Sequence, residues 1–140
     1  MTPPEVPEMG SGRDAEPFAP SIAPWLAVED AEKAVAYYSD AFGAVELYRL
    51  AGEDGKVVVA QLSVGGAVLW VQQDPETRPD AESRAAIRLI LSVEDPDTVF
   101  ARSVATGAAT VSPVSEEHGW RTGRISDPFG HQWEISRQLS

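Results

Sequence analysis

The stretch LAVED, Leu26 to Asp30, recurs as LSVED, Leu91 to Asp95, at a shift of 65 positions (91 − 26 = 65). In each copy alternating apolar residues lead to an aspartate, then to an amphipathic segment that ends at a glycine, Gly43 or Gly107. Alternation is typical of a strand, and an aspartate before an apolar repeat of helical period is a favourable N-cap. The sequence therefore predicts two copies of one strand–helix unit.

Both amphipathic segments have small or apolar residues at helical spacing, which predicts one buried face on each helix. The residues expected on these faces are Ala34, Tyr37, Tyr38 and Ala41 in the first copy and Val99, Phe100, Ser103 and Val104 in the second. Asp30 and Asp95 are expected to cap the two helices, and the acidic residues beside them suit the helix dipoles.

Three short strands are predicted after each helix. In the first copy they are VELYRL, KVVVAQLSV and AVLWVQQ, with turns at Gly52–Gly55 and Gly65–Gly66. In the second copy they are ATVSPV, RTGRIS and HQWEIS, with breaks at Glu117–Gly119 and Asp127–Gly130. Strands bounded by glycine-rich turns are typical of antiparallel sheets. We predict an α+β fold of two βαβββ modules, each forming a curved mixed sheet.

The two modules are expected at about 21–73 and 85–139, within a single domain that spans 21–140. A polar linker, Asp74 to Arg84, joins them. Residues 1–20 contain five prolines and no periodic apolar pattern, so we expect a disordered N-terminal tail.

Composition excludes several classes of function. The chain has 22 Asp and Glu against 11 Lys and Arg, and its net charge of -11 repels phosphate backbones, so no nucleic-acid partner is expected. The acidity serves solubility or steers a cationic ligand. The absence of cysteine excludes disulfides and thiolate metal sites. Because no apolar run has the length of a membrane span or of a signal peptide, we expect no membrane partner and a cytoplasmic location.

Two motifs connect the predicted fold to a known family. AEKAVAYYSDAFGA, from Ala31, and DPFGHQWEI, from Asp127, occur within the duplicated βαβββ unit. Together they resemble the glyoxalase, bleomycin-resistance and extradiol-dioxygenase superfamily, also called the vicinal oxygen chelate superfamily, over about Ser21 to Leu139. The similarity is greatest to small glyoxalase-like bacterial proteins.

This resemblance implies a fold that cups a small organic ligand between two modules, often across a homodimer. In the enzymes of the family it implies a divalent metal, bound by His, Glu or Gln at four positions. Two of these positions lie on the first strand of each module and two on the last.

The internal repeat locates the four positions in this chain. The resemblance places one at Ala23, in a first strand expected to begin near Ser21, and one at Glu134 in the last strand. Their repeat counterparts are Arg88, 65 positions after Ala23, and Trp70, 64 positions before Glu134. Methyl and indole groups donate no electron pair to a cation, and a guanidinium repels one. We expect no metal and no other cofactor, with a divalent metal as the less favoured alternative.

Neither histidine restores the site. His131 and Glu134 are three residues apart in one strand, so they face opposite sides of the sheet. His131 is therefore expected near the turn or the core, beside Trp133. His118, in a predicted loop, is at best a poor second ligand.

The residues expected in or around the cup are Ala23, Trp25, Trp70, Arg88, Ile90, Trp120 and Glu134. Arg88 and Glu134 either form a partly buried ion pair or bind a ligand, with Arg88 on a carboxylate or phenolate. Trp25 and Trp70 either bind a flat or cationic compound or fill the space of the lost metal. Glu134 is the one candidate for a catalytic residue, as a general base.

The chain contains neither the nucleophile elbow G-x-S-x-G nor a phosphate loop. The favoured hypothesis is a metal-independent small-molecule-binding protein that sequesters an aromatic or cationic compound such as an antibiotic. One alternative is a lyase, isomerase or dioxygenase-like enzyme with an atypical or absent metal site. Another is a structural or regulatory module with an empty cup.

Overall fold

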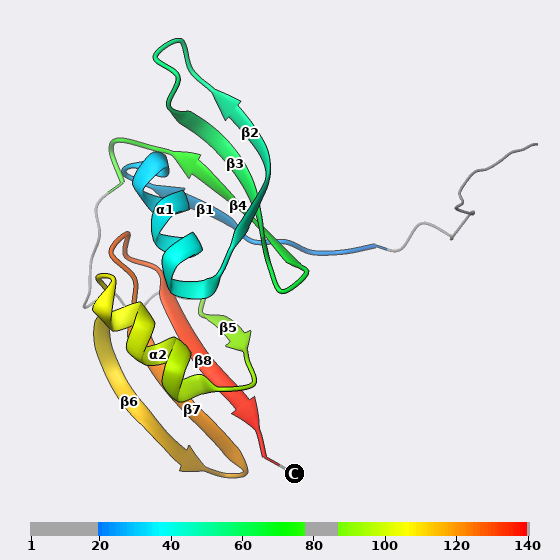
Figure 1. Cartoon of the computed structure of the whole chain (residues 1–140), viewed down its shortest axis with the longest axis vertical. Helices are drawn as coiled ribbons and strands as arrows, with labels where there is room; N and C mark the ends of the chain where they lie inside the picture. The colour runs from blue at the N-terminus through cyan, green and yellow to red at the C-terminus, as the bar shows by residue number, and fades with distance from the viewer. Residues whose placement is uncertain (1–19, 78–86, 140) are drawn as a thin grey trace, which may run out of the picture.

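The protein consists of two βαβββ modules, each with one helix and one four-stranded sheet (Figure 1). The computed structural model describes residues 20–77 and 87–139. The first module contains β1 (Trp25–Val28), α1 (Ala31–Phe42), β2 (Val45–Ala51), β3 (Val57–Val64) and β4 (Ala67–Gln73). The second contains β5 (Leu89–Ser92), α2 (Pro96–Ala105), β6 (Ala109–Glu117), β7 (Trp120–Ser126) and β8 (Gln132–Gln138).

The two sheets have the same topology, which confirms the predicted α+β class and the duplicated unit. Their strand orders are β1-β4-β3-β2 and β5-β8-β7-β6. In each sheet the first strand pairs in parallel with the last, and the other pairs are antiparallel. Residues 1–19 of the predicted tail and residues 78–84 of the predicted linker lie outside the described residues.

Helix α1 begins and ends where the sequence predicts. The Asp30 carboxylate accepts a hydrogen bond from the Lys33 backbone N–H at 3.1 Å, which satisfies one of the free donors of the first turn. Gly43 follows the helix with a φ of 71°, a left-handed conformation that glycine adopts without strain. The buried face consists of Ala31, Ala34, Tyr37, Tyr38, Ala41 and Phe42.

Helix α2 departs from its predicted face in one position. Asp95 caps it through the Thr98 backbone N–H at 3.2 Å, and Ser103 is buried as expected. Val104 is 37% exposed, so its predicted place in the core is wrong. Val99, Phe100 and Ser103 form the face that packs against the core, and Val104 lies at the edge of this face. Neither described helix is long and apolar enough to cross a membrane.

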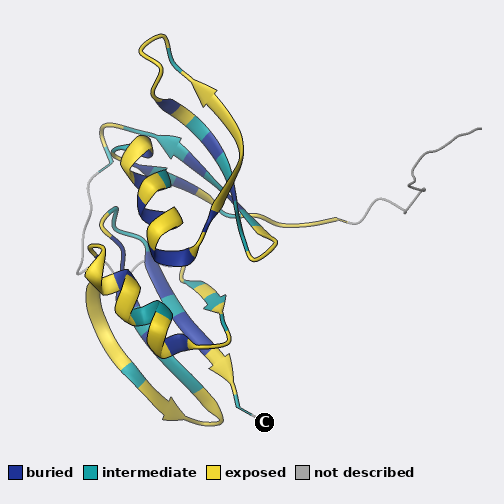
Figure 2. Ribbon diagram, in the orientation of Figure 1, coloured by how far each residue is buried: buried dark blue, intermediate teal, exposed yellow. Residues whose placement is uncertain are grey.

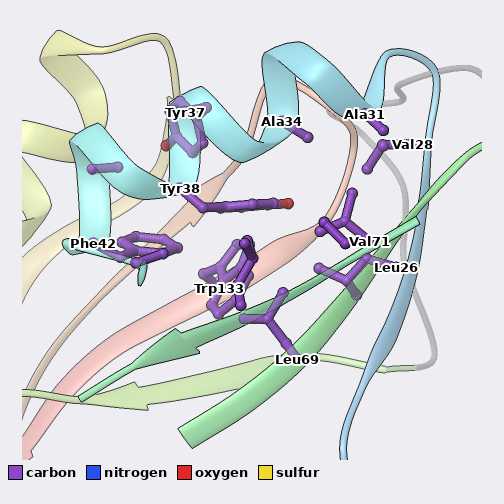
Figure 3. Packing of buried hydrophobic residues seen from close by; sticks show 14 of the residues in the cluster. Leu26, Val28, Ala31, Ala34, Tyr37, Tyr38, Phe42, Leu69, Val71 and Trp133 are labelled. Carbon is purple, nitrogen blue, oxygen red and sulfur yellow. The ribbon is translucent and has the colours of Figure 1, made fainter. Parts of the chain in front are cut away.

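The modules meet where α1 packs against β8. Figure 3 shows Tyr38 and Phe42 of α1 on one side of Trp133, with Leu69 of the first sheet nearby. The ring centroid of Trp133 lies 5.7 Å from that of Tyr38 and 4.8 Å from that of Phe42. These aromatic contacts between distant parts of the sequence join the two modules into one core.

A buried carboxylate lies beside this aromatic cluster. Asp127, 3% exposed, accepts hydrogen bonds from the Tyr38 hydroxyl at 2.6 Å and from Trp133 Nε1 at 2.8 Å. It also accepts from the backbone N–H groups of Phe129 and His131, both at 2.9 Å. Burial, followed by the charge of Asp127, raises the pKa of Tyr38 well above its ordinary value. The first residue of DPFG thus connects the β7–β8 turn, β8 and α1.

Replacing Asp127 by alanine is expected to lower the free energy of unfolding by at least about 3 kcal/mol, because it leaves several buried donors without an acceptor. Chemical denaturation followed by tryptophan fluorescence measures the change. The control is Asp54→Ala, which removes one exposed turn hydrogen bond to the Lys56 N–H. Equal losses in the two variants would show that the Asp127 network contributes no more to the free energy of unfolding than one exposed hydrogen bond does.

Candidate functional site

The predicted cup residues lie on the sheet faces that point away from the helices. In β1, Leu26 and Val28 are buried against α1, so the alternate residue Trp25 lies on the opposite face. In β8, Trp133 and Ile135 are buried on the helix side, and Glu134 lies on the opposite face. We call these the helix-free faces of the first and second sheets.

The helix-free face of the first sheet carries an aromatic wall, which we define as Trp25, Trp70 and Tyr48. Trp25 and Trp70 are register partners in β1 and β4, and their rings stack with centroids 5.7 Å apart and planes at 25°. Tyr48 of β2 meets Trp70 edge to face at 6.2 Å. Trp25 Nε1 donates a hydrogen bond to Gln72 Oε1 at 2.8 Å, which fixes the outer ring.

The helix-free face of the second sheet carries charges. Arg88 Nε lies 3.1 Å from Glu134 Oε1 and forms an ion pair with it. Ile90 is the register partner of Glu134 and is largely exposed. The repeat therefore identified two residues that the fold brings together. Their contact agrees with the interpretation of Arg88 and Glu134 as a partly buried ion pair.

Three predicted positions lie at the start of a strand or just before it. Ala23 precedes β1, which begins at Trp25, so the expectation that the first strand includes residue 23 is wrong. Arg88 likewise precedes β5 by one residue. A proline at position 24 has no N–H to donate to a ladder, which accounts for the late start of β1. Trp120 begins β7 and is 40% exposed.

Sequence reasoning missed Tyr48 and Arg124. Tyr48 pairs with Gln61, which in turn pairs with Trp70, so all three lie in one row across the first sheet. Arg124 of β7 is the register partner of Glu134 and shares its face. The strands on either side of the DPFG turn are antiparallel, so counting residues back from Glu134 across this turn would have identified Arg124 as its partner. No such count finds Tyr48, because β2 has an irregular register between Glu46 and Tyr48.

The histidines do not join Glu134. The His131 Nε2 atom lies 2.9 Å from the backbone carbonyl oxygen of Ala27, so this side chain links the β7–β8 turn to β1. His118 occupies the β6–β7 turn with a φ of 54°. Among residues 20–77 and 87–139, no three His, Asp or Glu side chains are grouped in a way that could hold a metal ion. The absence of a metal remains a prediction.

The fold and the motifs define a member of a known family. Residues 20–135 match the Glyoxalase/Bleomycin resistance protein/Dioxygenase superfamily, and the chain belongs to it. An uncharacterized protein of Mycobacterium bovis is 33% identical over 128 residues, which are 86% of this chain and 84% of that protein. An uncharacterized Mycobacterium tuberculosis protein is also 33% identical, over 75% of its length.

Solved structures show the same fold. TioX from Micromonospora sp. ML1 is 31% identical and superposes with a TM-score of 0.69, over 86% of this chain and all of TioX (100%). The fosfomycin resistance protein FosX from Listeria monocytogenes superposes with a TM-score of 0.67 over 87% of this chain and 95% of that one. At 18% identity, FosX is similar in fold alone.

The chain purified without chelators is expected to hold well under one divalent ion per molecule, because one carboxylate paired with a guanidinium is a weak ligand set. Elemental analysis after extensive dialysis measures this. Glu134→Gln serves as the matched variant and is expected to have the same metal content. One tightly held ion per chain that disappears in Glu134→Gln would contradict the expectation.

Proposed function

We propose that this protein binds and sequesters a small aromatic or cationic organic compound without the help of a metal. The observation that carries the proposal is the stacked Trp25–Trp70 pair on the helix-free face of the first sheet. Trp25 remains 53% exposed although it is stacked on one side. An indole with a free face is suited to receive another flat or cationic group.

The aromatic wall is held in place before a ligand arrives. The hydrogen bond from Trp25 to Gln72 and the contact of Tyr48 with Trp70 restrict the two ring systems. A site that is already ordered loses less side-chain entropy on binding. The net charge of -11 adds an attractive field for cationic compounds.

Sequestration accounts for the site better than catalysis does. Glu134, the one candidate for a general base, has its Oε1 atom in an ion pair with Arg88. A base needs an oxygen within hydrogen-bond reach of the proton that it removes. The name of the family includes bleomycin resistance, and one fold neighbour is a fosfomycin resistance protein. Antibiotics are therefore the first natural compounds to test.

Tryptophan fluorescence titrations with metal-free bleomycin and with a neutral naphthyl-butyl alcohol test the proposal. Trp25→Ala is expected to weaken binding about five- to thirtyfold, the value of one stacking or cation–π contact. Arg88→Ala is expected to weaken the binding of a compound that carries a carboxylate or phenolate, because that group would lose the guanidinium as its partner. Both variants should keep their thermal midpoints, because both side chains are substantially exposed.

Ile22→Ala is the matched control, since Ile22 is 99% exposed and outside the aromatic wall. Mass spectrometry of the recovered compound completes the test. Chemically altered compound would support an enzyme instead. Unchanged affinity in both Trp25→Ala and Arg88→Ala would place the ligand elsewhere.

We also propose that the protein is a homodimer, as the family resemblance implies. Strand β2 is the edge of the first sheet, and it leaves Val45, Leu47 and Leu50 about half exposed (Figure 2). An exposed apolar edge strand of this kind favours association with another chain. Static light scattering should give twice the 15.1 kDa chain mass. A mass of one chain at micromolar concentration would contradict the proposal.

A further inference from the structure

Strand β7 carries a row of buried polar atoms that have no partner. Among the described residues, the unsatisfied buried side-chain atoms are Thr122 Oγ1, Arg124 Nε and Ser126 Oγ. Side chains two residues apart in a strand share a face, so the three lie in line. Most buried polar groups in proteins have a partner, and each exception calls for a physical explanation. Three exceptions in one row indicate a common cause.

Tight packing on the other face of β7 fixes the direction in which these three side chains point. A Cβ atom on Gly123 would lie 2.8 Å from ring carbon Cδ2 of Phe100 and 2.8 Å from Val114 Cγ2. Ile125 is fully buried on the same side. The strand is therefore held with Gly123 and Ile125 toward α2 and the core, and the polar row is directed to the helix-free face.

Of the three residues, Arg124 loses the most free energy by lacking a hydrogen-bond partner, because a guanidinium is charged at every accessible pH. Its register partner is Glu134, whose Oε1 atom already pairs with Arg88 at 3.1 Å. The structure gives Arg124 no ion pair within residues 20–77 and 87–139. The middle of this face thus holds two guanidinium groups and one carboxylate, although the whole chain is strongly acidic.

The space in front of Arg124 is suited to the end group of a ligand. A cavity of about 190 Å³ there is lined by residues of β6, β7 and β8, including Ser112, Ser115, Thr122, Arg124 and two carboxylates, the exposed Glu117 and the ion-paired Glu134. Sites for whole drug-sized ligands are typically about 300–1,000 Å³. A cavity this small and polar fits one acidic group, not an entire aromatic compound.

A second cavity lies beside Trp25 of the aromatic wall and is lined by residues other than those around Arg124. It measures about 380 Å³ at the junction of the two sheets, and Trp25, Leu89 and Gln132 contribute to its walls. Gln132 is the register partner of Ser126, which is two residues from Arg124. Two residues of a strand span roughly 7 Å, and an arginine side chain covers much of that. Gln132, Ser126 and Arg124 therefore form a row that leads along the sheet from the cavity beside Trp25 toward the cavity in front of Arg124.

We propose that Arg124, with the Thr122 hydroxyl, binds an acidic oxygen group of the ligand, such as a carboxylate or sulfonate, while Trp25 and Trp70 hold its aromatic part. The inference rests on the proposed function and narrows it, since the ligand becomes an aromatic acid. The Nε atom of Arg124 gains a charge-assisted hydrogen bond, for which residues 20–77 and 87–139 supply no acceptor. Thr122 donates its hydroxyl hydrogen to the same group.

Three probes with one carbon skeleton test the inference by isothermal titration: naphthyl-butyric acid, naphthyl-butyl alcohol and naphthyl-butyl amine. The unmodified protein is expected to bind the acid at least about tenfold more tightly than the alcohol, because a charge-assisted hydrogen bond is worth more than a neutral one. Arg124→Gln is expected to abolish this preference and to leave the affinity for the alcohol unchanged within about twofold.

Arg121→Gln is the matched control. Arg121 belongs to the same strand but pairs with Asp97 of α2 and with Glu116, away from the cavity. This variant should keep the acid preference. Thr122→Val, which removes only the hydroxyl function, should reduce the preference about threefold.

The outcomes separate the two proposals. Binding of the alcohol without a preference for the acid overturns the assignment of Arg124 and leaves the aromatic wall intact. A preference for the amine overturns it as well and favours a cationic ligand. Failure of all three probes to bind overturns both proposals. A thermal midpoint that falls sharply in Arg124→Gln would show a structural role, whereas a ligand-binding role predicts an unchanged or higher midpoint, because a buried Nε atom without a partner is removed.

Discussion

The carboxylate of Asp127 is the interaction on which the rest of the structure depends. It accepts hydrogen bonds from a tyrosine of the first module, from the indole of Trp133 and from two backbone N–H groups of its own turn. These bonds hold Trp133 on the helix side of β8. Because a strand alternates, Glu134 is then directed to the helix-free face, with Arg124 opposite it. One buried charge thus connects the modules and sets the register of the candidate site.

The two modules have the same fold but different surfaces. One row of the first sheet presents Trp25, Trp70 and Tyr48, and the equivalent row of the second presents Ile90, Glu134 and Arg124, with Arg88 paired to Glu134. The family resemblance implies metal ligands at four of the matching positions, and this chain retains Glu134 alone. An apolar aromatic surface and a charged surface together suit a ligand with two unlike ends. The two halves thus share one architecture and differ in the chemistry of their helix-free faces.

Much of this was predictable because the signals are local or repeated. The repeat at a shift of 65 positions predicted both helices. Combined with strand alternation, it also predicted that Arg88 lies near Glu134, and the two form an ion pair. Ala23 was misplaced because Pro24 delays the start of β1. Tyr48 was missed because a register irregularity in β2 hides its row. The position of Arg124 opposite Glu134 could have been counted from the DPFG turn, but its lack of a partner depends on the positions of all neighbouring side chains and not on any spacing in the sequence.

The most direct test of the account is a crystal structure of the protein with naphthyl-butyric acid, with anomalous diffraction data collected at the absorption edges of common divalent metals. We expect density for the naphthyl group against Trp25 and Trp70, density for the carboxylate at Arg124, and no anomalous peak at Glu134. An anomalous peak coordinated by Glu134, with the Arg88 ion pair broken and the probe bound to the metal, would contradict it.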